Sequence, residues 1–475
     1  MYYRSDTSIV CFAAASTKLT VLAAILLSGA AVSLFLSNKL SQFDTAQMFP
    51  SAPFIISSIG ILERIGTMLL ICGALSLAIA LVVHIVQSDA TRIAQQVRKG
   101  LCCPAFGNPL HFRDGERLPA IHCKLSGLGE YELSISATTC TVEDLGKLAS
   151  FVSSTLNRGK YRRYAVTQSV ADVAFNEVKY RIEDVTIDKA LYVHDVSELM
   201  QKDPTKLAIQ KGTFLDLRYS SSILSAGKTR SGKTTSIACL LIQVLLMGRD
   251  KYGSEVMIVD PKSAELSRLP YVFTLDENGE ATLILDAVKK FAASITERQR
   301  ILNDQSQQCG DAVKWWDTGM KPSYLFIDEY VALRSLLPKK ADKDRPDYCL
   351  ATFDALVKRI VTMGASSGSF IIISIAEASV EEGGLPAMLR SAMGTKILFK
   401  PTLPEARLLW DSDKLQDFQN SRIYGAGDAW FSSQDGVHDF PSYVHFPVMD
   451  FPVYRELGRL LSEYYKDNGF TARSA

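Results

Sequence analysis

A glycine-rich stretch near the middle of the chain has the residue types and spacing of a phosphate-binding loop. Residues 227–234 read GKTRSGKT, which matches the pattern G-x-x-x-x-G-K-[ST]. The glycines let the backbone curl so that several N–H groups point at phosphate oxygens, and the following helix adds its partial positive charge. The residues assigned to nucleotide binding are Gly227, Lys228, Thr229, Arg230, Ser231, Gly232, Lys233, Thr234 and Thr235.

Two of these residues have individual roles in such a loop. Lys233 is expected to bridge the β- and γ-phosphates of ATP, and Thr234 is expected to ligate Mg²⁺ through its hydroxyl. An apolar run, SSILSA, precedes the turn and a helical stretch, TTSIACLLIQVLL, follows it. This strand–turn–helix context is the one in which the pattern binds phosphate.

A second apolar run ends in two adjacent acids. Residues 324–329 read YLFIDE, so a buried strand is predicted to present Asp328 and Glu329 at its tip. In a P-loop ATPase, Asp328 holds Mg²⁺ through water and Glu329 acts as the general base on the attacking water. The predicted catalytic residues are therefore Glu329 and Lys233, with ATP and Mg²⁺ as cofactors.

The elements that must position these residues follow from short apolar runs between longer helical stretches. The runs lie at 221–227, 255–260, 323–328, 369–376 and 394–400. Continuous apolar runs of this length are typical of strands buried on both faces of a mostly parallel sheet, which predicts a wound α/β fold. The formal net charge of +1 excludes a protein that holds nucleic acid by overall basicity alone.

The N-terminal region has two uncharged apolar runs, each long enough to cross a bilayer as a helix. We predict a transmembrane hairpin over residues 19–88, with spans at about 19–38 and 65–86, after a cytoplasmic N-terminus at 1–18. Arg4 and Lys18 precede the first span, and Arg92, Arg98 and Lys99 follow the second, so the positive-inside rule places both ends in the cytoplasm.

The remaining boundaries come from changes in pattern. Residues 100–200 are predicted to form a small membrane-proximal α+β domain, with a strand pair at 122–137 that turns at Gly127 and Gly129. A helix at 141–156 begins with a capping box at Thr141. The motor domain is placed at 205–455, and a C-terminal helix and tail at 456–475.

Several stretches resemble, in order, the FtsK/SpoIIIE family of membrane-anchored, RecA-like motor ATPases. They are ILSAGKTRSGKTT, DPKSAEL at 260–266, AVKKFAASITERQRILND at 287–304, LFIDEYVAL, LVKRIVTMGASSGSFIIISIAEAS at 356–379, GLPAMLRSAMGTKILFK and GAGDAWF. The resemblance spans about residues 205–450. It implies a RecA-like P-loop fold, a homohexamer with ATP between subunits, and DNA as the translocated substrate.

The chain departs from the family pattern at three places. Arg230 stands where the family's loop has glycine. The sensor strand of the family usually ends in Thr-Gln, whereas this chain has Glu377. The family arginine before that strand is replaced by Ala365-Ser366, which leaves Arg359 and Arg390 as candidates to act on a neighbouring subunit's site.

Residues 337–346 form a basic stretch that is expected either to face DNA in the ring's channel or to be an ordinary solvated loop. Its candidate DNA-contacting residues are Lys339, Lys340, Lys343 and Arg345.

Two spans, a small domain and one motor resemble the short FtsK-like coupling proteins of Gram-positive conjugative elements. This implies a multi-pass protein of the bacterial cell membrane, with its ATPase domain in the cytoplasm, that moves DNA to a transfer pore and meets relaxase and channel proteins. The alternatives are a chromosome-segregation or cell-division DNA pump, a protein-secretion ATPase of the same family, and a nucleotide-binding membrane scaffold that does not turn over.

Overall fold

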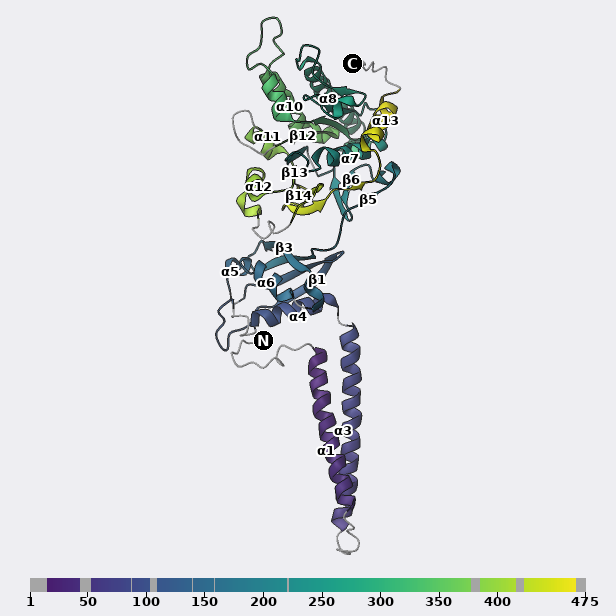
Figure 1. The fold of residues 1–475 in the computed structure, drawn as a ribbon, viewed down its shortest axis with the longest axis vertical. Helices are drawn as coiled ribbons and strands as arrows, with labels where there is room; N and C mark the ends of the chain where they lie inside the picture. The colour runs from purple at the N-terminus through teal and green to yellow at the C-terminus, as the bar shows by residue number, and fades with distance from the viewer. Residues whose placement is uncertain are drawn as a thin grey trace. The chain divides into compact units, whose positions relative to one another are not determined.

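The computed structural model describes residues 15–42, 53–86, 88–102, 109–138, 140–157, 159–219, 222–376, 385–415 and 423–466. The chain divides into two compact units, Met1–Ile187 and Asp188–Ala475. The first holds two long apolar helices and a small α+β domain, and the second holds a large sheet with helices on both faces (Figure 1).

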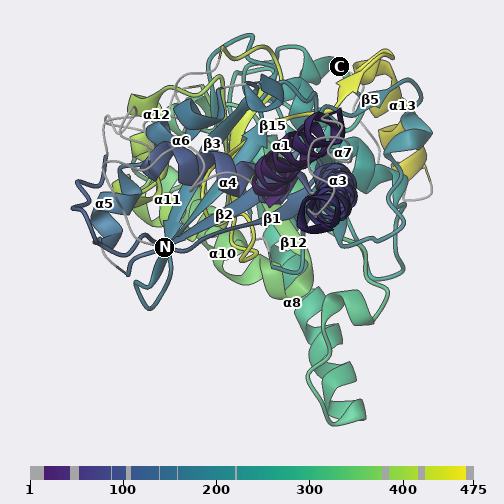
Figure 2. The ribbon, with the colours of Figure 1, turned by 90° about the horizontal axis from the view of Figure 1, so that it is seen from below.

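The two apolar helices, α1 (Ala15–Gln42) and α3 (Pro53–Val86), lie side by side (Figures 1 and 2). A Cβ atom on Gly66 would come within 2.8 Å of Leu34 Cγ, and one on Gly73 would come equally close to Leu27 Cγ. Small residues therefore allow the close approach that is typical of packed membrane helices. Ser33 Oγ adds a hydrogen bond to the Leu62 carbonyl, at 2.7 Å.

Both helices expose most of their apolar surface. The segments Lys18–Ser41 and Ile59–Val83 have mean hydropathies of 2.4 and 2.5, and only 17% of each is buried. Core helices of a soluble protein would be mostly covered, so this surface fits lipid better than water. The helices are longer than the spans predicted from charge, because α3 starts at Pro53 and carries the charged pair Glu63 and Arg64 within it.

The small domain is a four-stranded antiparallel sheet in the order β1-β2-β4-β3, with helices packed against it. The strand pair predicted at 122–137 is confirmed, as is the Thr141 cap, whose hydroxyl accepts from the Asp144 N–H. The single helix expected over 141–156 is instead two helices that meet at Lys147 and Leu148. The elements are β1 (Ile121–Gly127), β2 (Glu130–Ser136), β3 (Tyr164–Ala171), β4 (Glu177–Asp184), α4 (Asp89–Cys102), α5 (Val142–Gly146) and α6 (Ala149–Leu156).

The second unit is built on an eight-stranded sheet in the order β10-β9-β11-β12-β8-β13-β14-β15. The first six strands run parallel, and β14 and β15 are antiparallel to their neighbours. The five apolar runs of the sequence form the strands predicted for them. The strands are β8 (Ile223–Gly227), β9 (Val256–Val259), β10 (Val272–Phe273), β11 (Ser323–Ile327), β12 (Ser369–Ile375), β13 (Thr395–Phe399), β14 (Asp428–Ser433) and β15 (Ser442–His445).

Helices cover both faces of this sheet, which explains why its strands are apolar at every position. One face packs against α7 (Lys233–Leu246) and α13 (Val453–Tyr465). The other face packs against α8 (Thr282–Cys309), α9 (Tyr330–Leu336), α10 (Leu350–Met363), α11 (Ala387–Ala392) and α12 (Leu403–Leu409). Shorter pairings flank the sheet: β6 (Lys206–Gln210) with β7 (Thr213–Asp216), and β5 (Tyr192–Val193) with β16 (Val448–Met449).

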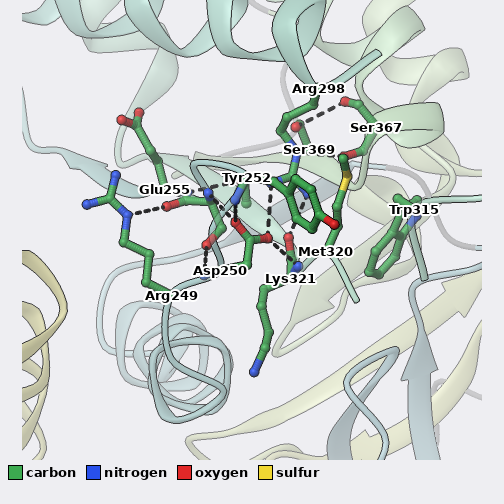
Figure 3. Close-up of polar contacts among 12 residues, drawn as sticks. Arg249, Asp250, Tyr252, Glu255, Arg298, Trp315, Met320, Lys321, Ser367 and Ser369 are labelled. Atoms are coloured by element: carbon green, nitrogen blue, oxygen red, sulfur yellow. Dashed lines mark hydrogen bonds and ion pairs between the residues drawn. The ribbon is translucent and has the colours of Figure 1, made fainter. Parts of the chain in front are cut away.

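A buried arginine organises the end of the sheet where the strands begin. Arg298 of α8 is 1% exposed and donates to the carbonyls of Ser367, at 2.8 Å, and Lys321, at 2.7 Å (Figure 3). Its guanidinium lies 3.4 Å from Asp250, whose carboxylate also accepts backbone N–H groups from Tyr252 and Lys321. This cluster ties α8 to the segments that lead into β9, β11 and β12, at the edge opposite the glycine turn.

Candidate nucleotide-binding site

The glycine turn joins β8 to α7 at the carboxyl edge of the parallel strands, where open α/β sheets bind ligands. Gly232 has φ +89°, and a Cβ on it would lie 2.5 Å from the Gly427 nitrogen. A Cβ on Gly227 would meet Phe399 Cβ at 2.8 Å. Both positions therefore need glycine, the first for its conformation and the second for close approach.

The backbone conformation at Arg230 explains why the family pattern has glycine at this position. This residue has φ +63°, in the left-handed region where glycine is favoured. An arginine there costs about 1 kcal/mol or more in backbone strain. Its carbonyl accepts from Lys400 Nζ at 3.3 Å, an interaction that holds the strained peptide in place.

Lys233 lies at the centre of the site and is 7% exposed. Its Nζ donates to the carbonyl of Ile375, the last residue of β12, at 2.9 Å, and lies 3.8 Å from Glu329 Oε1. Burial lowers the pKa of Lys233, and the carboxylates of Glu329 and Asp328 oppose that shift. The lysine is thus held by groups that a phosphate anion can replace.

The two acids follow β11, and the strand order places them near the turn. One strand, β12, separates β11 from β8, and Asp328 N–H bonds the Val259 carbonyl at 2.9 Å on the other side. Burial raises the pKa of Asp328. The Ser374 hydroxyl lies beside this carboxyl group and opposes the rise in its pKa. Within the described part of the chain, neither Asp328 Oδ1 nor Ser374 Oγ, both buried, makes a hydrogen bond of standard geometry.

An unsatisfied buried carboxylate oxygen is the kind of group a hydrated Mg²⁺ completes. Asp328 therefore fits the metal role given to it. Thr234, half-buried in the first turn of α7, supplies the hydroxyl that the same ion needs.

Glu329 is held in an unusual conformation. It has φ +51° directly before α9, and its Oε1 lies 3.3 Å from Lys262 Nζ. Non-glycine residues in this region carry strain and are frequent at functional sites. In the sequence, Lys262 belongs only to the DPKSAEL stretch that resembles the family, and no local pattern signals its contact with Glu329, because the two residues are far apart in the chain.

Asp260, in the same DPK turn, is structural in this geometry. It is 1% exposed and accepts backbone N–H groups from Lys262, Ala264 and Ser267 at 2.9–3.1 Å. These bonds shape the turn that carries Lys262 to Glu329.

A second turn, residues 425–428, supports the glycine loop. Gly427 N–H donates to the Ser231 carbonyl at 2.9 Å. Asp428 accepts the Gly425 N–H at 2.6 Å and the Tyr443 hydroxyl at 2.7 Å, and lies 2.5 Å from His445 Nδ1. The carboxylate raises the pKa of His445, and the histidine contact lowers the pKa of Asp428 although burial opposes it.

Two of the other proposed residues, Arg359 and Arg390, lie away from this centre. Arg359 is exposed on α10 and bonds Thr296 Oγ1 at 2.5 Å, and Arg390 is half-buried in the last turn of α11. Both helices end just before strands β12 and β13 begin, so these arginines lie toward the sheet edge opposite the glycine turn. Glu377 lies outside the described residues.

The basic stretch at 337–346 is largely exposed. Lys339, Lys340 and Lys343 face solvent. Arg345, by contrast, is paired with Glu280 at 2.6 Å and lies over the Tyr348 ring at 4.7 Å. All four candidate DNA contacts are therefore exposed, and Arg345 already has an intramolecular partner.

The fold and the site define a P-loop ATPase domain on a mostly parallel sheet. No family model matches the chain. The FtsK domain-containing protein YdcQ of Bacillus subtilis (strain 168) is 28% identical over 152 residues, which make up 32% of this chain and 28% of that relative. The matched stretch thus spans less than a third of the relative, and it confirms the resemblance to FtsK-domain proteins.

The chain also aligns in part with two solved structures. The pCW3 conjugation coupling protein TcpA, in a monomer form with ATPγS, aligns with 78% of this chain and 99% of its own, at 14% identity and a TM-score of 0.45. EssC (ATPases 2 and 3) from Geobacillus thermodenitrificans aligns with 59% of this chain and 53% of its own, at 15% identity and a TM-score of 0.41.

Proposed function

We propose that this chain is a membrane-anchored ATPase that translocates DNA, and that it serves as the coupling protein that delivers DNA to a transfer pore in conjugation. The observation that carries the ATPase assignment is the meeting of Lys233 with Glu329, 3.8 Å apart, beside the unsatisfied oxygen of Asp328. A cation, a base and a metal ligand then share one sheet edge with a loop whose two glycines cannot be replaced.

The chemistry follows from these positions. When ATP binds, Lys233 exchanges the Ile375 carbonyl for β- and γ-phosphate oxygens, and the loop N–H groups cradle the phosphates. Thr234 and Asp328 would hold Mg²⁺, which would supply positive charge to neutralise the phosphates. Glu329, released from Lys262, accepts the proton of the attacking water.

The coupling to DNA rests on the resemblance to FtsK-domain proteins and on the exposed basic loop. Lys339, Lys340 and Lys343 contact DNA phosphates, which makes binding weakly sequence-specific and salt-sensitive. Arg359 and Arg390 lie toward the edge away from their own glycine turn, a placement that suits action on a neighbouring subunit in a homohexamer. Relaxase and channel proteins are the expected partners.

The anchoring rests on the exposed apolar helices α1 and α3. Arg92, Arg98 and Lys99 follow α3, so the ATPase unit lies in the cytoplasm under the positive-inside rule, and the hairpin makes the chain a multi-pass protein of the bacterial cell membrane.

The test uses the full chain in lipid nanodiscs, with ATP hydrolysis measured with and without DNA. We expect ATP turnover that DNA stimulates. Turnover should fall by at least about 100-fold in Lys233→Ala and Glu329→Gln. The control variant Lys251→Ala, which removes an exposed lysine outside the site, should retain wild-type turnover. Strand displacement of a DNA triplex reports movement. Nucleotide binding without turnover would point instead to a scaffold, and turnover indifferent to DNA would contradict the translocase.

A further inference from the structure

The small domain contains a pocket that the ATPase function does not use. It has a volume of about 390 Å³ and lies between α4 and the end of α6. Most of the described residues that line it belong to one helix, α4. They are Arg92, Gln95, Gln96, Lys99 and Gly100 of α4, together with Thr155 and Gly159.

The amphipathic pattern of α4 builds this pocket. Ile93, Val97 and Leu101 are fully buried against the domain, so the adjoining face presents residues at positions 92, 96 and 99 together. A Cβ on Gly100 would meet Thr155 Cγ2 at 2.2 Å, which shows how closely α4 approaches α6. Gln96 Nε2 stabilises the contact between α4 and α6 by donating a hydrogen bond to the Thr155 carbonyl at 2.8 Å.

The lining suits an anion. Two side chains are cations and two are amides, and none of the described residues that line the pocket is acidic. Asp89, one turn before Arg92, is engaged by Lys160 Nζ at 2.7 Å and Tyr161 OH at 2.8 Å. A phosphate group, which arginine and lysine bind through charge and hydrogen bonds, matches this set of donors.

The chain places this pocket close to the membrane. The apolar segment of α3 ends at Val83, α3 itself ends at Val86, and α4 begins at Asp89. Helical rise plus the short connection limits Arg92 to about 20 Å from the end of that segment. Basic groups immediately cytoplasmic of a membrane helix lie where anionic headgroups are concentrated.

We propose that this pocket binds the headgroup phosphate of an anionic phospholipid and so fixes the small domain to the bilayer surface. The proposal rests on the membrane anchoring proposed above. Arg92 and Lys99 supply the charge, and Gln95 supplies a further hydrogen-bond donor. The Thr155 hydroxyl already donates to the Val152 carbonyl, at 2.7 Å. Arg98 is not among the described residues that line the pocket, and its guanidinium donates to the Ile121 carbonyl at 3.1 Å.

The experiment compares full-length protein in nanodiscs that contain phosphatidylcholine with or without phosphatidylglycerol. Native mass spectrometry measures which lipids stay bound. We expect the wild-type chain to retain phosphatidylglycerol above its bulk share, and the Arg92→Gln/Lys99→Gln double variant to lose that enrichment by about tenfold. The control variant Lys147→Gln, which removes an exposed lysine of the same domain, should retain the phosphatidylglycerol enrichment.

Two further variants keep the test independent of folding. Lys99→Gln alone is expected to lose part of the enrichment, and Lys99→Arg to keep it. Equal enrichment in wild type and the double variant would overturn the proposal. Displacement of the lipid by millimolar inorganic phosphate would assign the pocket to free phosphate, and DNA binding in phosphatidylcholine discs that the double variant abolishes would assign it to a nucleic-acid backbone.

Alkaline extraction tests the membrane anchoring separately from the lipid-binding pocket. A chain that alkali releases from membranes would contradict the anchoring itself. A chain that stays in the membrane but shows no preference for anionic lipid would contradict the pocket alone.

Discussion

The Nζ atom of Lys262 lies 3.3 Å from Oε1 of Glu329, so the proposed general base is paired with a cation from the turn that follows a different strand, β9. Glu329 is in the left-handed conformation at φ +51°, and Lys233 lies 3.8 Å from the same oxygen. To reach an attacking water, the Glu329 carboxylate must first leave this ion pair, so Lys262 restrains the side chain.

Replacement of Lys262 with glutamine should therefore raise ATP turnover measured without DNA. The pair is partly exposed, which limits its strength to about 1 kcal/mol and the gain to about fivefold. Steady-state hydrolysis of the full chain measures this, with Lys290→Gln, which removes an ion pair to Glu255 elsewhere, as the control. A fall in turnover would mean that Lys262 contacts the substrate instead.

The Mg²⁺ requirement should depend on pH through Asp328. Burial raises the pKa of this carboxyl group, and a metal ligand must be deprotonated. As the pH falls toward the raised pKa, protons compete with Mg²⁺, so the half-saturating Mg²⁺ concentration rises by up to about tenfold per pH unit below it. Asp328→Asn should need more Mg²⁺ at every pH and lose this dependence. An identical slope in wild type and variant would count against Asp328 as the ligand.

The contact between His445 and Asp428 should make stability depend on pH. Because Asp428 raises the pKa of His445 above 6.5, the histidine's contribution is fully present below 6.5 and is lost as the pH rises through the raised value. We expect the melting temperature of the wild type to drop by about 2–4 °C across that rise. His445→Gln should melt lower at pH 6 and show a flatter profile, as measured by differential scanning fluorimetry. Parallel profiles for the two proteins would refute this role.

Arg298 should be essential to the second unit's stability. It is 1% exposed, and its loss would leave the buried carboxylate of Asp250 without its cation. Arg298→Met is expected to destabilise the protein by about 3–5 kcal/mol. Arg300→Met, two residues further along α8 and exposed, should change stability by less than about 0.5 kcal/mol. Chemical denaturation compares the two, and similar losses would contradict the buried cluster's importance.

The hairpin should depend on Gly66 and Gly73. A valine at either position would clash with Leu34 or Leu27 and push α1 and α3 apart, whereas Gly60 has no atom within 4 Å of an added Cβ. We expect Gly66→Val and Gly73→Val to reduce disulfide cross-linking between cysteines introduced on the facing helices several-fold. Gly60→Val is the matched control, and cross-linking that is equal in all three would contradict this packing.

Local patterns in the sequence were enough to predict the glycine turn, the acid-tipped strand, the five parallel strands and the apolar helices. Each depends on consecutive residues: a phosphate loop needs glycines at fixed spacing, and a strand covered on both faces needs an unbroken apolar run. The split of the helix at Lys147 and the early start of α3 were missed, because helix ends depend on packing and capping as much as on local pattern.

Only the tertiary structure decided which side chains meet. Lys262 follows β9 and Glu329 follows β11, and they are neighbours because those strands pair in register. The same holds for the turn at 425–428, which reaches the glycine loop from the far end of the chain, and for Arg345, whose partner Glu280 lies in another segment. Contacts of this kind depend on strand order and crossing connections, and no spacing within one stretch of sequence encodes them.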